Sequence, residues 1–448
     1  MTTSYAALAA QQQKEVTNML EKLFGLTKAG TTVRTEVMAG IATFLTMAYI
    51  TVVNPAILST EGTGMGFGAV FTATIIAAVI GTLIMGLWAN WPVALAPGMG
   101  LNAFFTFGVI FGMGYTYQQA LAAVFVAGIV FIGLSVTPAR KYIINSIPKS
   151  MKLGVGAGIG LFLAIIGLKN AGVVVDNPAT LVGLGDVTSW PVLLTGLGFI
   201  IMAILDKRKV PGAIILGILA VSIIAWVTGI SSLGGVAGAI PSPAHAFSLD
   251  FSMIATAGFI GVAFAFLFVD FLDTAGTLTS VANLTDRVNE DGEVEGISRA
   301  VMADSVATTA GALVGTSNTT SYIESGAGIK EGGKTGLTAV VVALLFAACL
   351  FLAPLAQSIP AFATAPALIF IATYFLRNIA DIDWDDVTEY APAVLAAVLM
   401  PLTFSIAHGI ALGFIAYALI KALSGRMSDL NVGSISIAVV SVIYFIAV

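Results

Sequence analysis

The stretch GTSNTTSYIESGAGI, residues 315–329, is polar and rich in glycine, yet it lies between two strongly apolar segments. Backbone that is not helical is stable at membrane depth only where protein or a water-filled cavity supplies its hydrogen-bond partners. Glu324 would then be a carboxylate near the middle of the bilayer, where an ionisable group is costly and functional by default. We therefore expect a polar cavity around residues 315–329.

The composition of the whole chain supports a membrane setting. Of its 448 residues, 58% are hydrophobic and only 10% are charged, and the mean hydropathy is +0.99. A soluble domain carries roughly 25% charged and about 45–50% apolar residues, so the sequence predicts an all-α polytopic membrane protein. The one cysteine, Cys349, lies inside an apolar run, which excludes a disulfide within the chain and a cysteine metal site.

Polar borders divide the chain into apolar segments, most of them near the length of about 20 residues that crosses a bilayer. Residues 1–35 precede the segments as an N-terminal region, and an apolar region at 432–448 follows them. That last region is a fifteenth crossing, an interfacial helix, or the last span if the thirteenth and fourteenth segments form one broken helix. The third and tenth segments are too short or too broken to cross alone. The fourteen predicted segments are 36–57, 68–90, 97–111, 118–136, 152–168, 190–206, 211–229, 253–283, 299–315, 322–331, 335–356, 362–377, 389–404 and 408–424.

The basic residues predict the orientation of the chain. Lys and Arg gather in the cytoplasmic loops of membrane proteins. If the N-terminus is cytoplasmic, only Lys169 of the 19 Lys and Arg residues falls on the outside. We therefore expect a multi-pass protein with a cytoplasmic N-terminus.

Two sets of seven segments predict an inverted repeat, because an odd number of crossings turns the second copy over. The third segment contains APGMGLNAFF, residues 96–105, and the tenth contains the Glu324 stretch. Both are short and interrupted at matching positions, which is typical of a transporter binding site. The site is expected between these two segments, with helix N-termini directed at the ligand.

Acidic residues mark the eighth and ninth segments. The eighth carries DFLDTAGT, residues 270–277, in which Asp270 and Asp273 share one face of a helix and Thr277 continues the polar face. We interpret Asp273 as a site residue. Asp270 either reaches the site or gives structural support within the bundle. Asp304 in the ninth segment either orients the polar stretch or serves only at a helix end.

The third and tenth segments also offer groups that suit a planar, hydrogen-bonding ligand. Asn102 and Glu324 provide donors and acceptors, and three aromatic residues provide faces for stacking, namely Phe104, Phe105 and Tyr322. Burial favours the neutral form of a carboxylate, so Asp273 or Glu324 can take up a proton together with the solute. The coupling ion is therefore expected to be a proton. No cofactor, metal or nucleic acid is expected.

Four motifs resemble one transporter family. They are AGIATFLTMAYI (39–50) with Asn54-Pro55, APGMGLNAFF (96–105), DFLDTAGT (270–277) and SYIESGAG (321–328). Together they are similar to the adenine/guanine/hypoxanthine permeases, the AzgA-like branch of the nucleobase–cation symporter-2 (nucleobase:ascorbate transporter) family. Two further stretches, LKNAG (168–172) and DNPATL (176–181), resemble the bacterial adenine permeases among these. The resemblance runs from about residue 20 to residue 426.

The resemblance implies a fold of 14 spans in two inverted repeats, in which segments three and ten are half-helices with short extended pieces. A core domain would combine 36–136 with 253–356, and a gate domain 152–229 with 362–424. Asn102, Asp273 and Glu324 match binding residues of the family. The resemblance further implies homodimers formed through the gate domain, and proton-coupled uptake of adenine, hypoxanthine or guanine across the bacterial cytoplasmic (inner) membrane by alternating access, with adenine favoured.

Two other classes of function are weighed against this one. A transporter of the same fold for uracil, xanthine or another small solute is the alternative, although two acidic site residues disfavour an inorganic anion. An intramembrane enzyme is disfavoured because the sequence has no His-Glu-x-x-His or Gly-x-Ser-x-Gly pattern and only two histidines. His408 is expected in a turn that faces outside, and His245 in a solvated loop.

Overall fold

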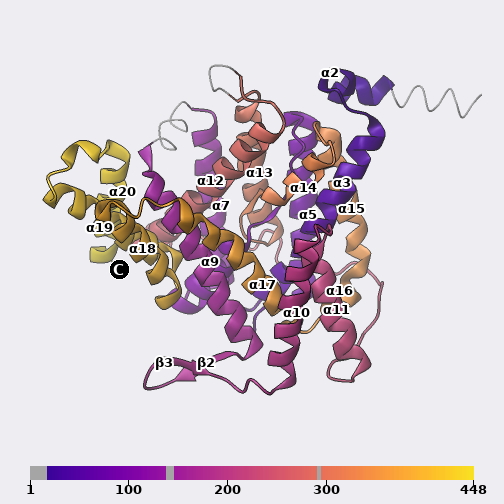
Figure 1. The fold of residues 1–448 in the computed structure, drawn as a ribbon, viewed down its shortest axis with the longest axis horizontal. Helices are drawn as coiled ribbons and strands as arrows, with labels where there is room; N and C mark the ends of the chain where they lie inside the picture. Colours follow the sequence, from indigo (N-terminus) through magenta and orange to yellow (C-terminus); the bar gives the residue numbers. More distant parts are fainter. Residues whose placement is uncertain (1–17, 138–145, 290–293, 448) are drawn as a thin grey trace, which may run out of the picture.

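The computed structural model describes residues 18–137, 146–289 and 294–447. This part of the chain is almost entirely helical, with two sheets of two strands each (Figure 1). Nine of its helical stretches are long and apolar enough to cross a membrane, and shorter apolar helices accompany them. The prediction of an all-α polytopic membrane protein is confirmed. The N-terminal helix α2 and the hairpin of β2 and β3 lie at opposite ends of the bundle (Figure 1).

The elements follow one another in two sets, with η marking 3₁₀- or π-helical turns. The first set is α2 (Leu26–Ala29), α3 (Val33–Met47), α4 (Ile50–Leu58), α5 (Phe67–Ile84), η1 (Met85–Ala89), β1 (Leu95–Pro97), α6 (Met99–Ala103), η2 (Phe104–Gly112), α7 (Tyr117–Ser135), α9 (Lys149–Ala171), β2 (Val174–Asn177), β3 (Leu181–Leu184), α10 (Trp190–Lys207) and α11 (Ala213–Val227). The second set is α12 (Ala257–Leu284), α13 (Ile297–Val314), β4 (Thr319–Ser321), η3 (Ile323–Ser325), α14 (Gly326–Lys330), α15 (Gly336–Cys349), η4 (Leu350–Leu352), α16 (Ala353–Gln357), α17 (Ala361–Leu376), η5 (Arg377–Asp381), α18 (Val387–Leu402), α19 (Ile406–Leu423), η6 (Met427–Asp429) and α20 (Val432–Ala447).

Helical stretches occupy all fourteen predicted segments, with small differences at the ends. Helix α12 begins at Ala257 and not at residue 253, because Thr256 caps it by accepting a hydrogen bond from the Phe259 N–H (3.2 Å). Helices α18 and α19 are separate and pack against each other, so they are not one broken helix. The apolar region at the end of the chain forms a further helix, α20, which packs on α19 and α12.

Packing divides the helices into two groups. In one group α9 packs against α17 and α18, and α10 packs against α11 and α17. In the other, α13 packs against α7 and α5, and α15 packs against α3 and α5. The close approach of α9 to α18 depends on Gly158, because a Cβ there would lie 2.4 Å from Met400 Sδ and 2.9 Å from Ala397 Cα. The first group therefore forms one tightly packed unit.

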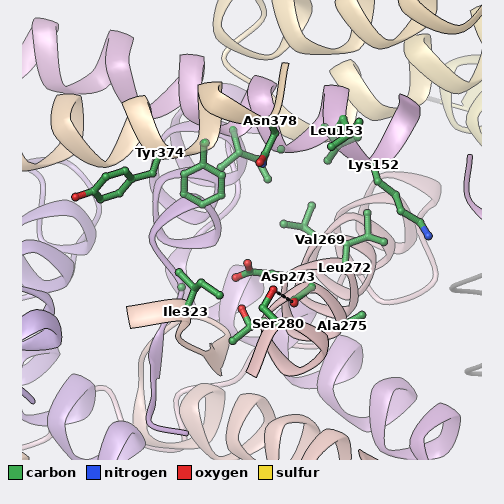
Figure 2. A pocket seen from close by; sticks show the side chains of 18 of the residues that line it. Lys152, Leu153, Val269, Leu272, Asp273, Ala275, Ser280, Ile323, Tyr374 and Asn378 are labelled. Atoms are coloured by element: carbon green, nitrogen blue, oxygen red, sulfur yellow. Dashed lines mark hydrogen bonds between the residues drawn. The ribbon is translucent and has the colours of Figure 1, made fainter. Parts of the chain in front are cut away.

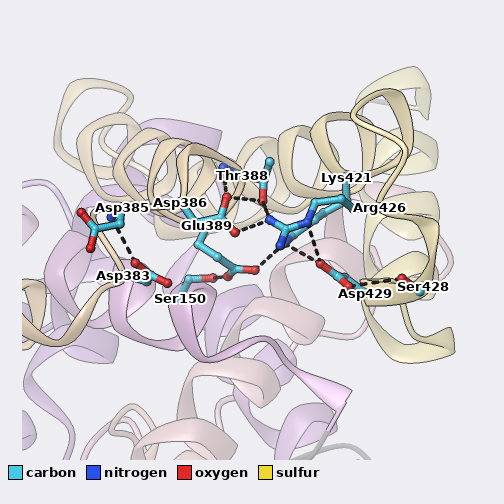
Figure 3. A network of polar contacts seen from close by, with 10 residues as sticks. All are labelled: Ser150, Asp383, Asp385, Asp386, Thr388, Glu389, Lys421, Arg426, Ser428 and Asp429. Atoms are coloured by element: carbon cyan, nitrogen blue, oxygen red, sulfur yellow. Dashed lines mark hydrogen bonds and ion pairs between the residues drawn. The ribbon is translucent and has the colours of Figure 1, made fainter.

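A polar network joins the ends of α9, α18 and α19 (Figure 3). Lys421 is only 1% exposed, and its Nζ lies 2.6 Å from Glu389 Oε1 and 3.0 Å from Asp429 Oδ2. Glu389 also accepts a hydrogen bond from the Ser150 hydroxyl on α9. A buried ammonium group is costly unless it is paired and hydrogen-bonded. The two carboxylates therefore explain how Lys421 is tolerated in the interior.

Both histidines lie elsewhere than expected. His408 belongs to the first turn of α19 and not to the preceding turn, because the Ser405 hydroxyl caps this helix by accepting a hydrogen bond from the His408 N–H (3.2 Å). His245 is buried and not solvated (8% exposed), and its Nε2 accepts a hydrogen bond from the Gly66 N–H (3.0 Å). Its ring meets the Tyr117 ring edge-on, with centroids 4.9 Å apart. The loop that carries His245 is thus folded back onto α5 and α7.

Candidate functional site

Two short buried strands, one from each half of the chain, pair with each other. Strands β1 and β4 are antiparallel, with Leu95 opposite Ser321 and Pro97 opposite Thr319. Helix α6 follows β1, and η3 with α14 follows β4. The two half-helices therefore leave the ribbon in opposite directions, with an N-terminus at each end of it. Backbone N–H groups at a helix N-terminus favour polar or anionic partners, so these two ends suit a bound ligand.

Protein groups satisfy the polar stretch around β4. The Ser317 hydroxyl donates to Asn102 Oδ1, and Asn318 Nδ2 donates to Asp270 Oδ2 (3.0 Å). The carbonyl oxygen of Asn318 accepts from the Gly98 N–H (2.9 Å). Non-helical backbone at membrane depth needs such partners. Here they come from α12 and from the matching segment of the other half.

Asp304 on α13 holds β4. Its Oδ1 accepts hydrogen bonds from the Ser321 N–H (2.7 Å) and hydroxyl (2.6 Å), and its Oδ2 accepts one from the Thr274 hydroxyl (2.7 Å). Thr82 on α5 holds β1 in the same way, because its Oγ1 accepts a hydrogen bond from the Leu95 N–H (2.9 Å). Leu95 and Ser321 are opposite each other in the ribbon. Of the two roles left open for Asp304, the geometry is that of orienting the polar stretch.

Asp270 lies behind the strands and is not among the residues that line the main cavity beside α12. It is fully buried, and its Oδ2 lies 2.6 Å from the Thr308 hydroxyl oxygen and 3.0 Å from Asn318 Nδ2. Its Oδ1 has no hydrogen-bond partner in the described chain. Asp270 therefore contacts the segment that carries the site, which is a supporting position.

A cavity of about 910 Å³ lies between α6 and α12 on one side and α9 and α17 on the other. One wall comes from the start of α6, the middle of α12 and Ile323; the other comes from α9, α17 and η5. Asp273 and Thr277 on α12 both line it. In Figure 2 the Asp273 carboxylate faces the open space, with Tyr374 and Asn378 on the opposite wall.

The ionisable groups of the cavity are few. The Asp273 side chain makes no hydrogen bond or ion pair with any other described residue. Lys152, Lys330 and Arg377 also line the cavity. Among residues 18–137, 146–289 and 294–447, no group of three or more His, Cys, Asp or Glu side chains is placed to hold a metal ion. A cation that enters this cavity would therefore meet single carboxylates and not a preformed metal site.

Glu324 lies next to Ile323, which lines the cavity, at the point where the chain leaves β4. Its Oε1 accepts a hydrogen bond from the Tyr49 hydroxyl (2.8 Å), at the junction of α3 and α4. Tyr322 is turned away and is 6% exposed, and its hydroxyl donates to the Pro97 carbonyl oxygen (2.5 Å). Glu324 and Tyr322 therefore have different surroundings although they are two residues apart.

Five of the seven expected ligand-binding residues do not line the cavity: Asn102, Phe104, Phe105, Tyr322 and Glu324. Asn102, Phe104 and Phe105 have no exposed surface. The rings of Phe104 and Phe105 pack on Phe266, with centroid distances of 5.1 Å and 6.3 Å. The start of α6 turns residues 98–101 to the cavity instead. The expectation that a ligand stacks on these three rings does not hold in this conformation.

Sequence reasoning missed the wall opposite Asp273 and the partner of Glu324. Tyr374 and Asn378 belong to α17 and η5, and the Tyr374 hydroxyl donates to Asp206 Oδ1 (2.9 Å). Single polar residues in an apolar segment form no pattern, so nothing in the sequence marked this wall. Tyr49 had one signal, because it lies inside the motif at residues 39–50.

Sequence comparison finds similar transporters over most of the chain. The model of the Permease family matches residues 34–412. The adenine permease AdeP of Escherichia coli (strain K12) is 45% identical over 414 residues, which cover 92% of this chain and 93% of that protein. The guanine/hypoxanthine permease PbuO of Bacillus subtilis (strain 168) is 42% identical over 418 residues, which cover 91% of this chain and 96% of that protein.

Solved structures share the fold at low sequence identity. The transmembrane domain of the cyanobacterium bicarbonate transporter BicA superposes with a TM-score of 0.65 at 16% identity, covering 84% of this chain and 96% of that one. The structure of SLC26A9 gives a TM-score of 0.65 at 11% identity, covering 92% and 70%. At such identities the likeness concerns the fold alone, a 7+7 inverted-repeat fold. The antiparallel pairing of β1 with β4 agrees with this symmetry.

Proposed function

Because this chain belongs to the Permease family, we propose that it carries purine nucleobases across the membrane together with a proton. The observation that carries the proposal is the Asp273 carboxylate, which lines a cavity of about 910 Å³ and has no partner in the described chain. The purine class is supported by relatives named for adenine and for guanine and hypoxanthine, which align with 92% and 91% of this chain. Adenine is the first candidate.

Recognition of a purine would use hydrogen bonds along its edge. A purine base is flat, with N–H donors and ring-nitrogen acceptors in one plane. Asp273 would accept from an N–H group of the base, and Thr277, one turn further along α12, can donate or accept. Glu324 would complete the site from the opposite half of the chain. Asn102, Phe104, Phe105 and Tyr322 would shape the site from behind by fixing α6 and β4.

The proton would bind to Asp273 or Glu324. Neither carboxylate has an ion-pair partner in the described chain, and a charge without a partner is unfavourable away from water. Proton uptake removes this cost, and it turns the carboxyl group into a donor for a ring nitrogen of the base. Base and proton would therefore bind together, which couples uptake to the proton gradient.

Transport would proceed by alternating access. In this proposal the chain has 14 spans, with a core domain from residues 36–136 and 253–356 and a gate domain from 152–229 and 362–424. Basic residues favour the cytoplasmic side, and Lys152, Lys330 and Arg377 line the cavity. We infer that the cavity opens to the cytoplasm, so that movement of the core against the gate would expose the site to the outside.

The setting of the transporter is part of the same proposal. The N-terminus would be cytoplasmic, and the membrane would be the cytoplasmic (inner) membrane of a bacterium. Two copies would associate through their gate domains. The alternative is a permease of the same fold that carries uracil, xanthine or another small solute.

Uptake by cells that lack their own purine permeases tests the proposal. Radiolabelled adenine would be offered with unlabelled hypoxanthine, guanine, xanthine or uracil as competitor, with and without a protonophore. We expect competition by purines and loss of accumulation with the protonophore. Asp273→Asn should abolish uptake, whereas Asp176→Asn in the exposed hairpin should not. Competition by uracil or xanthine alone would support the alternative, and no uptake by a chain that reaches the membrane would contradict both.

A further inference from the structure

Tyr49 is the one described side chain that holds the Glu324 carboxylate. Its hydroxyl donates to Glu324 Oε1 over 2.8 Å. The other carboxylate oxygen, Oε2, makes no hydrogen bond to another described residue. The two oxygens therefore differ, since a donor side chain fixes Oε1 and no described side chain fixes Oε2.

Tyr49 is itself held firmly. It is 1% exposed and lies where the first helical stretch breaks between α3 and α4. Pro55 in α4 has no N–H group and disfavours a regular helix over the preceding turn. The N–H groups of Val52 and Val53 both point to the Tyr49 carbonyl oxygen, at 3.1 Å and 2.9 Å. The break therefore sets the direction of the Tyr49 side chain.

The segment after Glu324, helix α14, packs closely against α3. A Cβ at Gly328 would lie 2.2 Å from Thr43 Oγ1 and 2.3 Å from the Ala39 carbonyl oxygen. Any side chain at this position would push α14 away from α3. Glu324 comes just before α14 and Tyr49 just after α3, so direct packing of these two helices helps to set the distance between the two residues.

We propose that Tyr49 is a positioning residue, which fixes Glu324 through Oε1 and leaves Oε2 to exchange the transported proton. The proposal rests on the proposed function only in assigning a proton to Glu324. A hydrogen bond donated to a carboxylate favours its charged form. Tyr49 therefore helps Glu324 to release its proton to the cytoplasm after the base has left.

Infrared difference spectroscopy on the purified protein in liposomes tests this role without measuring transport. The band of the protonated Glu324 carboxyl group would be identified by its loss in Glu324→Gln, and its midpoint followed in a pH titration. Tyr49→Phe should move the midpoint to higher pH by about one unit, because it removes one hydrogen bond to a charged group. Tyr417→Phe is the matched control, since Tyr417 is also buried (2% exposed) but lies in α19, and it should leave the midpoint unchanged.

Further outcomes keep the test decisive. If Tyr49→Phe does not fold, fluorotyrosine incorporation gives the opposite change, because a more acidic phenol is a stronger donor and should move the midpoint to lower pH. A midpoint that does not respond to either change, or the absence of a titrating Glu324 band, would overturn the proposal. The expected shift without any purine uptake would overturn the proposed function and leave the positioning role intact.

Discussion

Asp304 Oδ1 lies 2.7 Å from the Ser321 backbone nitrogen and 2.6 Å from the Ser321 hydroxyl oxygen. A carboxylate outside the cavity thus fixes the end of the strand that leads directly to Glu324. The strand is too short to be stable by itself, because a two-stranded ribbon is marginal without support from its surroundings. The geometry of the site therefore depends on a residue that no ligand needs to touch.

Asp304→Ala should destabilise the protein and nearly abolish purine uptake. The change removes the acceptor of the Ser321 N–H and hydroxyl, and each buried donor without a partner costs about 1–3 kcal/mol. Asp304→Asn should keep part of the stability and part of the uptake, because its amide oxygen can still accept a hydrogen bond from Ser321. Thermal unfolding in detergent, with uptake as the second readout, checks the prediction. Full uptake by Asp304→Ala would show that β4 does not depend on this carboxylate.

Gly328→Ala should lower uptake by separating α14 from α3. The new Cβ would meet Thr43 Oγ1 at 2.2 Å and the Ala39 carbonyl oxygen at 2.3 Å, and such overpacking costs about 1–3 kcal/mol. Gly196→Ala in α10 is the control, because nothing lies within 4 Å of its added Cβ. Unfolding temperature and uptake would be measured for both variants. Equal unfolding temperatures and equal uptake in the two variants would contradict the close packing of α14 on α3.

Lys421→Met should loosen the contact between α18, α19 and the chain that follows. It removes one partner from Glu389 and one from Asp429, which are 24% and 37% exposed, so water offsets part of the loss. We expect the free energy of unfolding to fall by about 1–3 kcal/mol, which is less than the loss from breaking a fully buried ion pair. The double variant Lys421→Met with Glu389→Gln should recover part of the lost stability. Thermal unfolding with Lys207→Met as an exposed control measures the effect, and a double variant less stable than Lys421→Met would refute the pairing.

Asp386 provides a pH-dependent contribution outside the membrane-spanning helices. Hydrogen bonds from Thr388 and the guanidinium of Arg426 lower the pKa of Asp386 to about 2. The pKa in the unfolded chain is about 3.9, so the stabilisation is complete above that value and is lost as the pH falls through about 2. Asp386→Asn should therefore lower the unfolding temperature at neutral pH, and its difference from wild type should shrink in acid.

Thermal unfolding of Asp386→Asn over a series of pH values checks this prediction. Asp385→Asn is the control, because the Asp385 side chain is exposed and Arg426 pairs with its neighbour Asp386 instead. A difference between Asp386→Asn and wild type that stays constant towards acid pH would mean that the ion pair does not contribute.

The helical segments and the interruptions between them could be predicted because they depend on local patterns. Hydropathy marks stretches that suit lipid, and polar, glycine-rich interruptions such as residues 315–329 mark backbone that needs partners. The expected short extended pieces in the third and tenth segments correspond to β1 and β4. On α12, Asp273 and Thr277 both line the cavity. Asp270, which was expected on the same face, contacts Thr308 and Asn318 instead.

The orientation of side chains after β1 could not be predicted. Helix α6 passes directly into the π-helix η2, whose wider turn changes the face on which each later residue lies. Phe104 and Phe105 therefore pack on Phe266 and not on the cavity. Burial of His245 likewise depends on how a long loop folds back, which residue types alone do not determine. The opposite wall, with Tyr374 and Asn378, arises from packing between distant segments.

The central claim is that a proton moves with a purine through a site built on Asp273 and Glu324. The most direct measurement uses purified protein in liposomes, with an imposed inward proton gradient, labelled adenine, and a pH indicator inside. We predict adenine accumulation above its equilibrium level together with adenine-dependent acidification, and loss of both in Asp273→Asn and Glu324→Gln. Accumulation in these two variants that equals wild type, or adenine movement that ignores the proton gradient, would contradict the claim.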